Sequence, residues 1–311
     1  NTTYELQNDL LYKYGDTLNM SVEIASVRDK KRLEQIFDTY RPQVVFHAAA
    51  HKHVPLMEGS PAEAVKNNVF GTYNTALTAR EYGAEKFVLI STDKAVNPTN
   101  VMGATKYLCE QVLQGLRREG GTEFAAVRFG NVLGSSGSVI PLFKKQIARG
   151  GPVTVTDKRI VRYFMTISEA VQLVLEAGSF AHSGEVFVLD MGEPVHILEL
   201  AEKMIRLSGF TPYVDIEIRE VGLRPGEKLY EELLISGKDL RRTENAKIFV
   251  EERPMVDNSQ LCWLLEQLRA AAESNDTCRV TACLHELVPT FRTPEEVNGA
   301  AIRAMEHKEV V

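Results

Sequence analysis

Residues 89–106 read LISTDKAVNPTNVMGATK. An apolar run from Lys86 to Ile90 ends in four polar residues, a proline-containing loop follows, and a helix then begins with a lysine one turn inside it. This pattern predicts a strand that presents reactive side chains at its C-terminal end, beside a helix that supplies one more. In parallel α/β sheets, ligands bind at that end of the strands.

Strand and helix patterns alternate on both sides of this stretch. We expect strands over residues 18–27, 44–46, 86–90 and 123–129, and helices over residues 4–14, 29–40, 61–82 and 101–118. Their spacing is that of βαβ units, which predicts an α/β fold with a doubly wound parallel sheet.

The pattern loosens after Ile140 and predicts a smaller mixed domain. We therefore expect one domain over residues 1–150 and a second over 151–311, with the strand at 186–189 returning to the main sheet. The other expected elements are strands near Val153 and over 214–218, helices over 168–180 and 197–207, and two amphipathic helices within 257–289.

The composition is that of an ordinary water-soluble protein: 311 residues, 44% hydrophobic and 25% charged. The net charge of −6 gives no reason to expect nucleic-acid binding. No apolar run reaches the roughly 18 residues of a membrane-spanning helix, and no signal peptide is evident. The four cysteines form no CxxC pair and His51-x-His53 has no carboxylate partner, so we expect reduced thiols and no metal site.

A dinucleotide-binding fold opens with a strand, a G-x-G-x-x-G loop and a helix, and this chain shows none of these at its start. Gly130, Gly134 and Gly137 follow a strand, but their spacing differs and they occur late, so we interpret them as a substrate-side loop. The chain begins at Asn1, within a helical pattern. We expect the first strand, the glycine loop and the second strand to lie upstream of residue 1.

Two lysines, Lys86 and Lys106, lie four residues after a residue that could share a helical face with them. Tyr82 and Lys86 have the Tyr-x-x-x-Lys spacing of short-chain dehydrogenases, but Gly83 ends the helix between them, so they cannot share a helical face. Met102 and Lys106 do share one. Because methionine cannot carry a proton, either the site is inactive or other residues transfer the proton.

Thr92, Asp93 and Lys94 are the neighbours that can donate or accept a proton. Asp93 and Lys94 alone would also suit an ordinary ion pair on a solvated turn. Ser91 before them and Asn97-Pro98-Thr99-Asn100 after them favour a functional site instead.

The stretch from Ser91 to Lys106 resembles the signature of the CapD-like nucleotide-sugar 4,6-dehydratases, extended short-chain dehydrogenase/reductases that act on UDP-N-acetylglucosamine. Met102 in place of tyrosine resembles their large, membrane-anchored branch, which retains the configuration at C5, whereas a smaller C5-inverting branch keeps the tyrosine. The resemblance extends over most of residues 27–235, through HAAAHKHVP (47–55), NNVFGT (67–72), RFGNVLGS (128–135), RYFMT (162–166) and LRPGEK (223–228).

The resemblance implies a Rossmann fold with NAD as cofactor, and a smaller domain that binds the nucleotide sugar. In the implied reaction NAD+ takes hydride from C4 of the sugar, water is lost across C5 and C6, and the hydride returns to C6. Thr92 would bind the 4-hydroxyl, and Lys106 would take its proton or bind the nicotinamide ribose. Lys94, which stands where glucose-type 4,6-dehydratases have glutamate, would be the base at C5, and Asp93 the acid at the leaving 6-hydroxyl.

These last two roles require a neutral carboxyl and a neutral amine. An exposed aspartate has a pKa of about 3.9, and a charged Lys94 would lower the pKa of Asp93 further. We therefore expect the pair to work in a closed, dry site that favours its neutral form, where the two groups titrate as one unit.

The resemblance also implies the binding residues. For His47 to Ala50 a plain strand end remains the alternative, and for Arg224 and Glu227 a surface pair at the start of a helix. The cofactor contacts would be His47, Ala48, Ala49, Ala50, Asn67, Ser91 and Lys106, and the substrate contacts Asn131, Ser135, Arg162, Arg224 and Glu227.

The expected partners are a UDP-N-acetylhexosamine substrate and further copies of the chain. We expect a cytoplasmic location, at the inner face of the membrane if an upstream segment anchors the protein. A C5-inverting dehydratase or a UDP-sugar 4-epimerase is the neighbouring enzyme alternative. A silent dinucleotide-sensing domain is favoured by the absent glycine loop and Met102, and opposed by Thr92, Asp93, Lys94 and Lys106.

Overall fold

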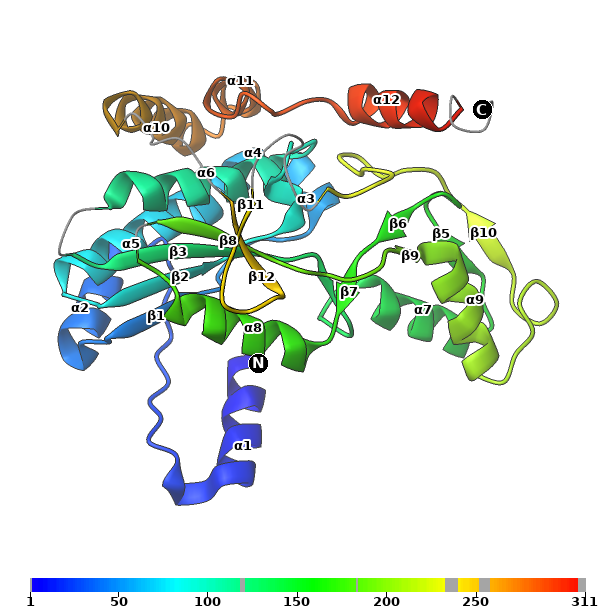
Figure 1. Cartoon of the computed structure of the whole chain (residues 1–311), viewed down its shortest axis with the longest axis horizontal. Helices are drawn as coiled ribbons and strands as arrows, with labels where there is room; N and C mark the ends of the chain where they lie inside the picture. Colours follow the sequence, from blue (N-terminus) through cyan, green and yellow to red (C-terminus); the bar gives the residue numbers. More distant parts are fainter. Residues whose placement is uncertain (1, 118–120, 183, 233–239, 252–257, 307–311) are drawn as a thin grey trace.

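The structure, a computed structural model, describes residues 2–117, 121–182, 184–232, 240–251 and 258–306 (Figure 1). Within these residues six strands form the main sheet, in the order β1, β2, β3, β8, β12, β11. The first four are parallel, and the last two are antiparallel. The predicted α/β fold with a mainly parallel sheet is confirmed. The strand bounds are Val44–His47, Lys86–Ile90, Glu123–Arg128, Glu185–Leu189, Ile248–Glu251 and Leu240–Arg242, in sheet order.

Helices cover both faces of this sheet, which explains the apolar strand sequences. Alternate residues of a strand point to opposite faces: Phe87 and Leu89 of β2 enter one core, whereas Val88 enters the other. The first core packs against α4 (Pro61–Ala64), α5 (Phe70–Glu81), α6 (Val101–Leu116), α10 (Asn258–Glu273) and α11 (Thr277–Leu287). The second packs against α8 (Ile167–Ser179).

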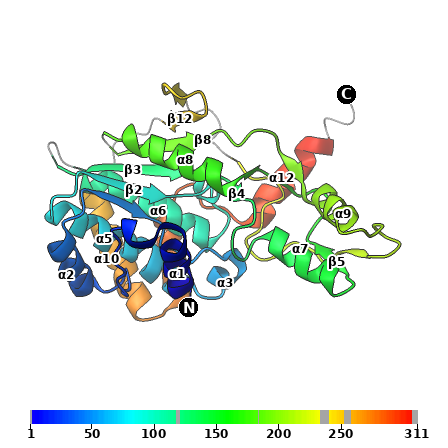
Figure 2. The ribbon, with the colours of Figure 1, turned by 90° about the horizontal axis from the view of Figure 1, so that it is seen from below.

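A smaller lobe extends from one end of the sheet (Figure 2). Its core joins α7 (Val139–Ala148) and α9 (Ile197–Leu207) to the parallel pair β5 (Val153–Val155) and β10 (Ile218–Glu220). Two short strand pairs connect the lobe to the sheet: β4 (Asn131–Val132) with β7 (Phe164–Met165), and β6 (Val161–Arg162) with β9 (Val195–His196). The sequence placed β10 a few residues early, at 214–218. Because β8 lies between β3 and β12 in the main sheet, the chain after residue 151 contributes to both the main sheet and the smaller lobe. The domain boundary at residue 150 stays a prediction.

The N-terminal segment departs from the expectation. Helix α1 (Thr2–Tyr14) forms as predicted but buries none of its residues, and a short turn, η1 (Gly15–Thr17), follows it. The strand predicted over 18–27 is wrong: these residues run as a single extended segment to α2 (Lys30–Tyr40), with Ile24 76% exposed (Figure 1). A strand needs a hydrogen-bonded neighbour, and among the described residues β1 pairs with β2 alone.

The predicted helix over 61–82 contains a π-helical turn, η2 (Val65–Val69), between α4 and α5. Gly83 follows the helix with a φ of +76°, as the sequence suggested. π-Helical turns often occur at functional sites, and η2 carries Asn67 and Asn68. The predicted end of α6 at Arg118 lies outside the described residues.

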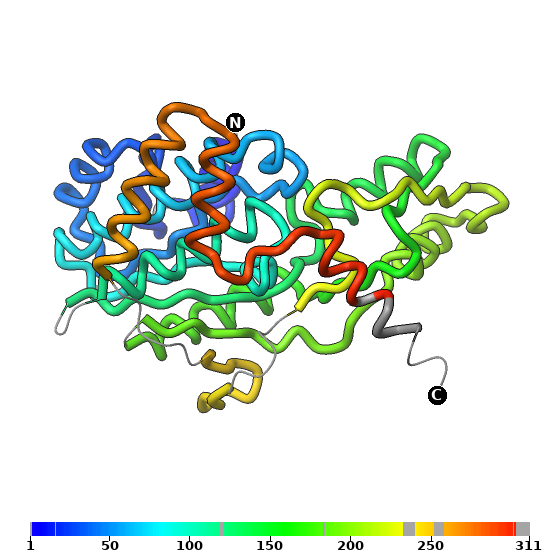
Figure 3. The backbone as a smooth tube through the Cα atoms, turned by 90° about the horizontal axis from the view of Figure 1, so that it is seen from above, coloured from blue at the N-terminus to red at the C-terminus, as the bar shows by residue number. Residues whose placement is uncertain are grey.

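The two helices predicted within 257–289 are confirmed as α10 and α11, although Asp257 itself lies outside the described residues. The sequence missed α3 (Val54–Glu58), α7 and α12 (Pro294–Glu306). Figure 3 shows the path of α10, α11 and α12 from the main sheet toward the smaller lobe. In the part of the chain that the structure describes, no helix has both the length and the apolar character needed to cross a bilayer.

Candidate functional site

A cleft of about 690 Å³ lies between the C-terminal ends of the parallel strands and the smaller lobe. The sequence predicted this end of the sheet as the site. Most predicted site residues line the cleft, among them Ala48, Ala50, Ser91, Thr92, Lys94, Lys106, Asn131, Ser135, Arg162, Arg224 and Glu227.

The strand β2 delivers the central residues through a short turn, η3 (Asp93–Ala95). The Thr92 hydroxyl caps this turn by accepting from the Lys94 amide at 3.4 Å. Asn100 caps α6 by accepting from the Gly103 amide at 2.7 Å. The turn and the helix meet at Gly103, where a Cβ atom would collide with the Lys94 carbonyl oxygen. Only glycine permits this approach, which sets the position of Lys94 relative to α6.

We expect Gly103→Ala to lower the free energy of unfolding by about 1–3 kcal/mol, because the added methyl must push the Lys94 backbone away. Urea denaturation measures the change. Gly59→Ala is the control, since its Cβ would meet its nearest neighbour at an ordinary 3.7 Å. Equal stability of the Gly103 variant and wild type would contradict this packing.

Asp93 and Lys94 form an ion pair in which Lys94 lines the cleft, whereas Asp93 lies behind it and does not. The Asp93 Oδ1 accepts from the Thr92 hydroxyl at 2.8 Å and from Lys94 Nζ at 2.9 Å. The Asp93 side chain is fully buried, and its Oδ2 has no hydrogen-bond partner. Burial lowers the pKa of Lys94, but Asp93 and Glu231 outweigh this and raise it above its usual value. The geometry therefore favours the Lys94 ammonium, not the neutral pair that the sequence argument required.

Glu231 is a cleft residue that the sequence reasoning missed. Its Oε1 lies 3.6 Å from Lys94 Nζ and 3.8 Å from Arg162 Nε. Burial raises the pKa of Glu231, whereas Lys94, Arg162 and Lys228 lower it, and their effect prevails. No signal in the sequence marked this residue, because it follows the last recognisable motif in a stretch without periodicity.

Met102 and Lys106 lie on one face of α6 and both line the cleft. Lys106 is 5% exposed. Burial lowers its pKa, and the neighbouring Cys109 and Glu110 offset only part of this. A lowered pKa means that the amine loses its proton at a lower pH than an exposed lysine, which suits a proton acceptor.

A buried charge network lies behind the end of β2. Arg128 of β3 donates from Nε and Nη2 to the two oxygens of Glu110 at 2.8 and 2.6 Å, and from Nη1 to Glu251 at 2.9 Å. Ser91 donates to Glu110 at 2.6 Å, so the predicted cofactor contact is also part of the network. All three charged side chains are at most 1% exposed. The network joins α6, β3 and β12.

Removing the central cation should destabilise the fold strongly. We expect Arg128→Met to lower the free energy of unfolding by about 3–5 kcal/mol, because it removes the cation that two buried carboxylates share. Arg219→Met is the control: its pair with Glu217 is more than half exposed and should matter by less than about 1 kcal/mol. A loss for Arg128→Met as small as the control's would refute the inferred role.

His47, predicted as a cofactor contact, lies in the protein interior, and its cofactor role stays a prediction. Its ring packs on Phe87 and lies 3.1 Å from the Thr72 hydroxyl, and it is 4% exposed. Burial, aided by Lys106, lowers its pKa to about 3, so the ring is neutral. His47 is a core residue at the end of β1 and does not line the cleft, and neither does Ala49.

Asn67 lies outside the cleft lining too, and donates to the next side chain, Asn68, at 3.2 Å. Asn68, which was missed, accepts from the His51 amide at 2.8 Å and donates to the His51 carbonyl at 3.1 Å. It also donates to Thr105 at 3.0 Å. The π-turn thus fixes the loop after β1 against α6.

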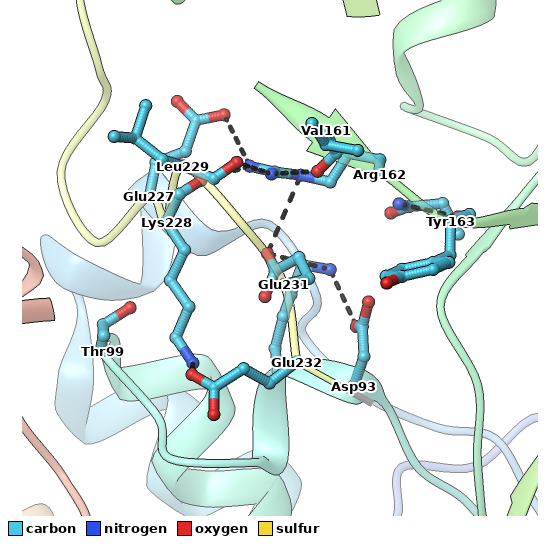
Figure 4. Close-up of polar contacts among 12 residues, drawn as sticks. Asp93, Thr99, Val161, Arg162, Tyr163, Glu227, Lys228, Leu229, Glu231 and Glu232 are labelled. Atoms are coloured by element: carbon cyan, nitrogen blue, oxygen red, sulfur yellow. Dashed lines mark hydrogen bonds and ion pairs between the residues drawn. The ribbon is translucent and has the colours of Figure 1, made fainter. Parts of the chain in front are cut away.

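Arg162 cross-links the smaller lobe (Figure 4). Its guanidinium donates to the carbonyls of Val161, Leu229 and Lys228 at 2.7–3.0 Å, and pairs with Glu227 at 3.5 Å. Most of its donors are therefore engaged within the protein. Its role as a nucleotide contact stays a prediction.

Arg224 and Glu227 contact each other at 3.1 Å, and Arg224 is 57% exposed. The helix expected after them does not form in the described residues up to 232. Instead the turn is fixed from two sides. The Gly226 carbonyl accepts from Thr99 at 3.1 Å and from Asn100 at 3.0 Å. The residues on either side of Lys228 bond to Asn298 of α12, which accepts from the Leu229 amide and donates to the Glu227 carbonyl.

The residues present fit the nicotinamide end of a dinucleotide. The small side chains of Ala48 and Ala50 leave the backbone at the end of β1 accessible, and Ser91 and Lys106 face the same cleft. A G-x-G-x-x-G loop is absent from the sequence. Among the described residues, no three His, Cys, Asp or Glu side chains are placed to hold a metal ion.

The parallel sheet and the polar groups at its C-terminal edge define an α/β protein of the extended short-chain dehydrogenase/reductase type. The chain belongs to the polysaccharide biosynthesis protein family, which matches residues 1–253.

Three relatives illustrate the family, and two solved structures resemble the chain. CapD of Staphylococcus aureus, a capsular polysaccharide biosynthesis protein, is 57% identical over 75% of this chain and 39% of its own length. EpsC of Bacillus subtilis, a probable polysaccharide biosynthesis protein, is 47% identical over 97% of this chain and 49% of its own. The chain thus spans less than half the length of these two relatives.

An inverting UDP-N-acetylglucosamine 4,6-dehydratase of Campylobacter jejuni is 38% identical over 75% of this chain and 67% of its own. The X-ray structure of Pen from Bacillus thuringiensis covers 82% of this chain and 80% of its own at 36% identity, with a TM-score of 0.73. The dTDP-glucose 4,6-dehydratase DesIV of Streptomyces venezuelae, solved with NAD bound, shares the fold at 21% identity, with a TM-score of 0.60 over 67% of this chain and 68% of its own.

Proposed function

We propose that the chain is the catalytic part of an NAD-dependent UDP-N-acetylglucosamine 4,6-dehydratase for bacterial polysaccharide biosynthesis. The observation that carries the proposal is the placement of Thr92, Lys94 and Lys106 in one cleft, with the buried Asp93 bonded to both Thr92 and Lys94. The family and the dehydratase relative from Campylobacter jejuni support it. A silent sensing domain would not need this buried acid–base set.

The bound cofactor would supply hydride transfer from C4 and back to C6. Thr92 would bind the 4-hydroxyl through its Oγ1. Lys106 would accept the 4-hydroxyl proton, because burial lowers its pKa and so makes the amine form more accessible than in an exposed lysine. Met102 would contribute packing alone.

Asp93 and Lys94 would carry out the elimination. Loss of water needs a base for the C5 proton and an acid for the 6-hydroxyl. Transfer of a proton from Lys94 Nζ to Asp93 Oδ1, across their 2.9 Å contact, leaves an amine and a carboxylic acid side by side. The amine would then take the C5 proton while the acid protonates the leaving oxygen.

We expect Asp93→Asn and Lys94→Met each to reduce dehydration by at least about a hundredfold, the usual contribution of a general acid or base. UDP-sugar binding should change little, since most cleft contacts remain. Single-turnover product analysis and calorimetry measure the two quantities. Lys158→Met, a change at an exposed lysine, is the control, and wild-type turnover in either test variant would refute the assignment.

The reaction itself is tested by incubating the protein with NAD+ and UDP-N-acetylglucosamine. We expect a product lighter by one water, with no net reduction of NAD+. In heavy water, NMR at C5 then separates retention, which Met102 favours, from inversion. A product of unchanged mass with inverted C4 would instead identify a 4-epimerase, and no turnover would favour the silent domain.

A further inference from the structure

Glu231 lies between two cations in the cleft wall (Figure 4). Its Oε1 is 3.6 Å from Lys94 Nζ and 3.8 Å from Arg162 Nε, and its side chain is only 4% exposed. Its other oxygen, Oε2, is buried without a hydrogen-bond partner. A carboxylate in this position loses its hydration, and the nearby positive charges must offset that cost.

Lys94 in turn lies between two carboxylates that are far apart from each other in the sequence. Asp93, its neighbour in η3, contacts Nζ at 2.9 Å, and Glu231 approaches from the segment after β10. The other charged groups nearby are already paired. Arg162 binds backbone carbonyls and Glu227, and Lys228 contacts the Val96 carbonyl at 3.0 Å and Glu232 at 3.4 Å.

We propose that Glu231 is a positioning residue that, together with Asp93, holds the Lys94 ammonium group between two carboxylates and so strengthens Lys94 as a base. Its role in the reaction rests on the proposed dehydratase function. When the Lys94 amine takes the C5 proton, an N–H bond forms as the C5–H bond breaks, and the nitrogen becomes positive. The negative charge of Glu231 stabilises that ammonium, which favours removal of a weakly acidic C–H proton.

The negative charge of Glu231 also reduces the fraction of Lys94 that is present as the free amine. By stabilising the ammonium, Glu231 raises the pH at which Lys94 becomes an amine, in line with the raised pKa of Lys94. The proposed elimination uses the Asp93–Lys94 pair with its one shared proton, which the pair loses at high pH. Loss of Glu231 should therefore move the falling, high-pH limb of the pH–rate profile to lower pH and reduce the plateau rate, because a weaker base remains. A purely structural role would lower the rate without moving the limb.

The direct test uses no sugar substrate. The protein is acetylated with acetic anhydride over a range of pH, and peptide mass spectrometry follows modification of Lys94, whose side chain is 18% exposed. In Glu231→Gln we expect the midpoint of Lys94 reactivity to fall by about one to three pH units. Glu232→Gln is the matched control, because Glu232 pairs with Lys228 and Asn97 and its loss should leave the midpoint in place.

An unchanged midpoint in Glu231→Gln would overturn the proposal. If that variant folds poorly, Glu231→Asp serves instead: its carboxylate lies one methylene further from Lys94, so a midpoint below the wild-type value is expected and an unchanged one again overturns it. The dehydration assay is scored separately. A shifted midpoint in a protein that makes no 4-keto sugar would refute the proposed function while the control of Lys94 by Glu231 stands.

Discussion

The buried guanidinium of Arg128 is the constraint on which the site depends. It lies in the central strand β3 and binds Glu110 of α6 and Glu251 of β12. Glu110 in turn accepts from Ser91, the first residue after β2, and contributes to the charge environment of Lys106. Two carboxylates around one cation are tolerated in the core only because all three are paired. The network therefore fixes the relative positions of the strand end and the helix that carry the proposed chemistry.

A second set of contacts brings the smaller lobe to this frame. The Gly226 carbonyl binds Thr99 and Asn100 in the loop before α6, and Asn298 of α12 fixes the backbone around Lys228. Arg162 binds the carbonyls of Lys228 and Leu229. The segment so fixed carries Glu231, which is how a residue distant in sequence reaches Lys94. The cleft is thus built as much by backbone anchoring as by its lining residues.

The features that the sequence predicted correctly depend on residues that are close together along the chain. The apolar strand ending at Ile90, the helix that begins near residue 29, and the shared face of Met102 and Lys106 all follow from nearest neighbours along the chain. What it missed depends on distant partners. The neighbours of Glu231, the backbone bonds of Asn68 and the core position of His47 exist only once separate segments meet. The wrong strand at 18–27 has the same origin, since its side chains suit a strand but no described neighbour pairs with it.

The charges of the cleft also indicate which cation would meet a diphosphate. Lys94 is committed to Asp93 and Glu231, and the Arg162 donors are used by carbonyls and carboxylates. A diphosphate at either would have to displace buried partners. Arg224 differs, because it is 57% exposed and, among the described residues, its ion pair is with Glu227, three residues along the same turn. Glu227 is only 11% exposed, but it would keep its contact with Arg162 at 3.5 Å if Arg224 turned to a phosphate. The planar guanidinium of Arg224 can bind the phosphate oxygens in pairs. Of the two arginines that the sequence proposed for the nucleotide, the charge balance therefore favours Arg224, and Arg162 would instead hold the wall of the cleft in place.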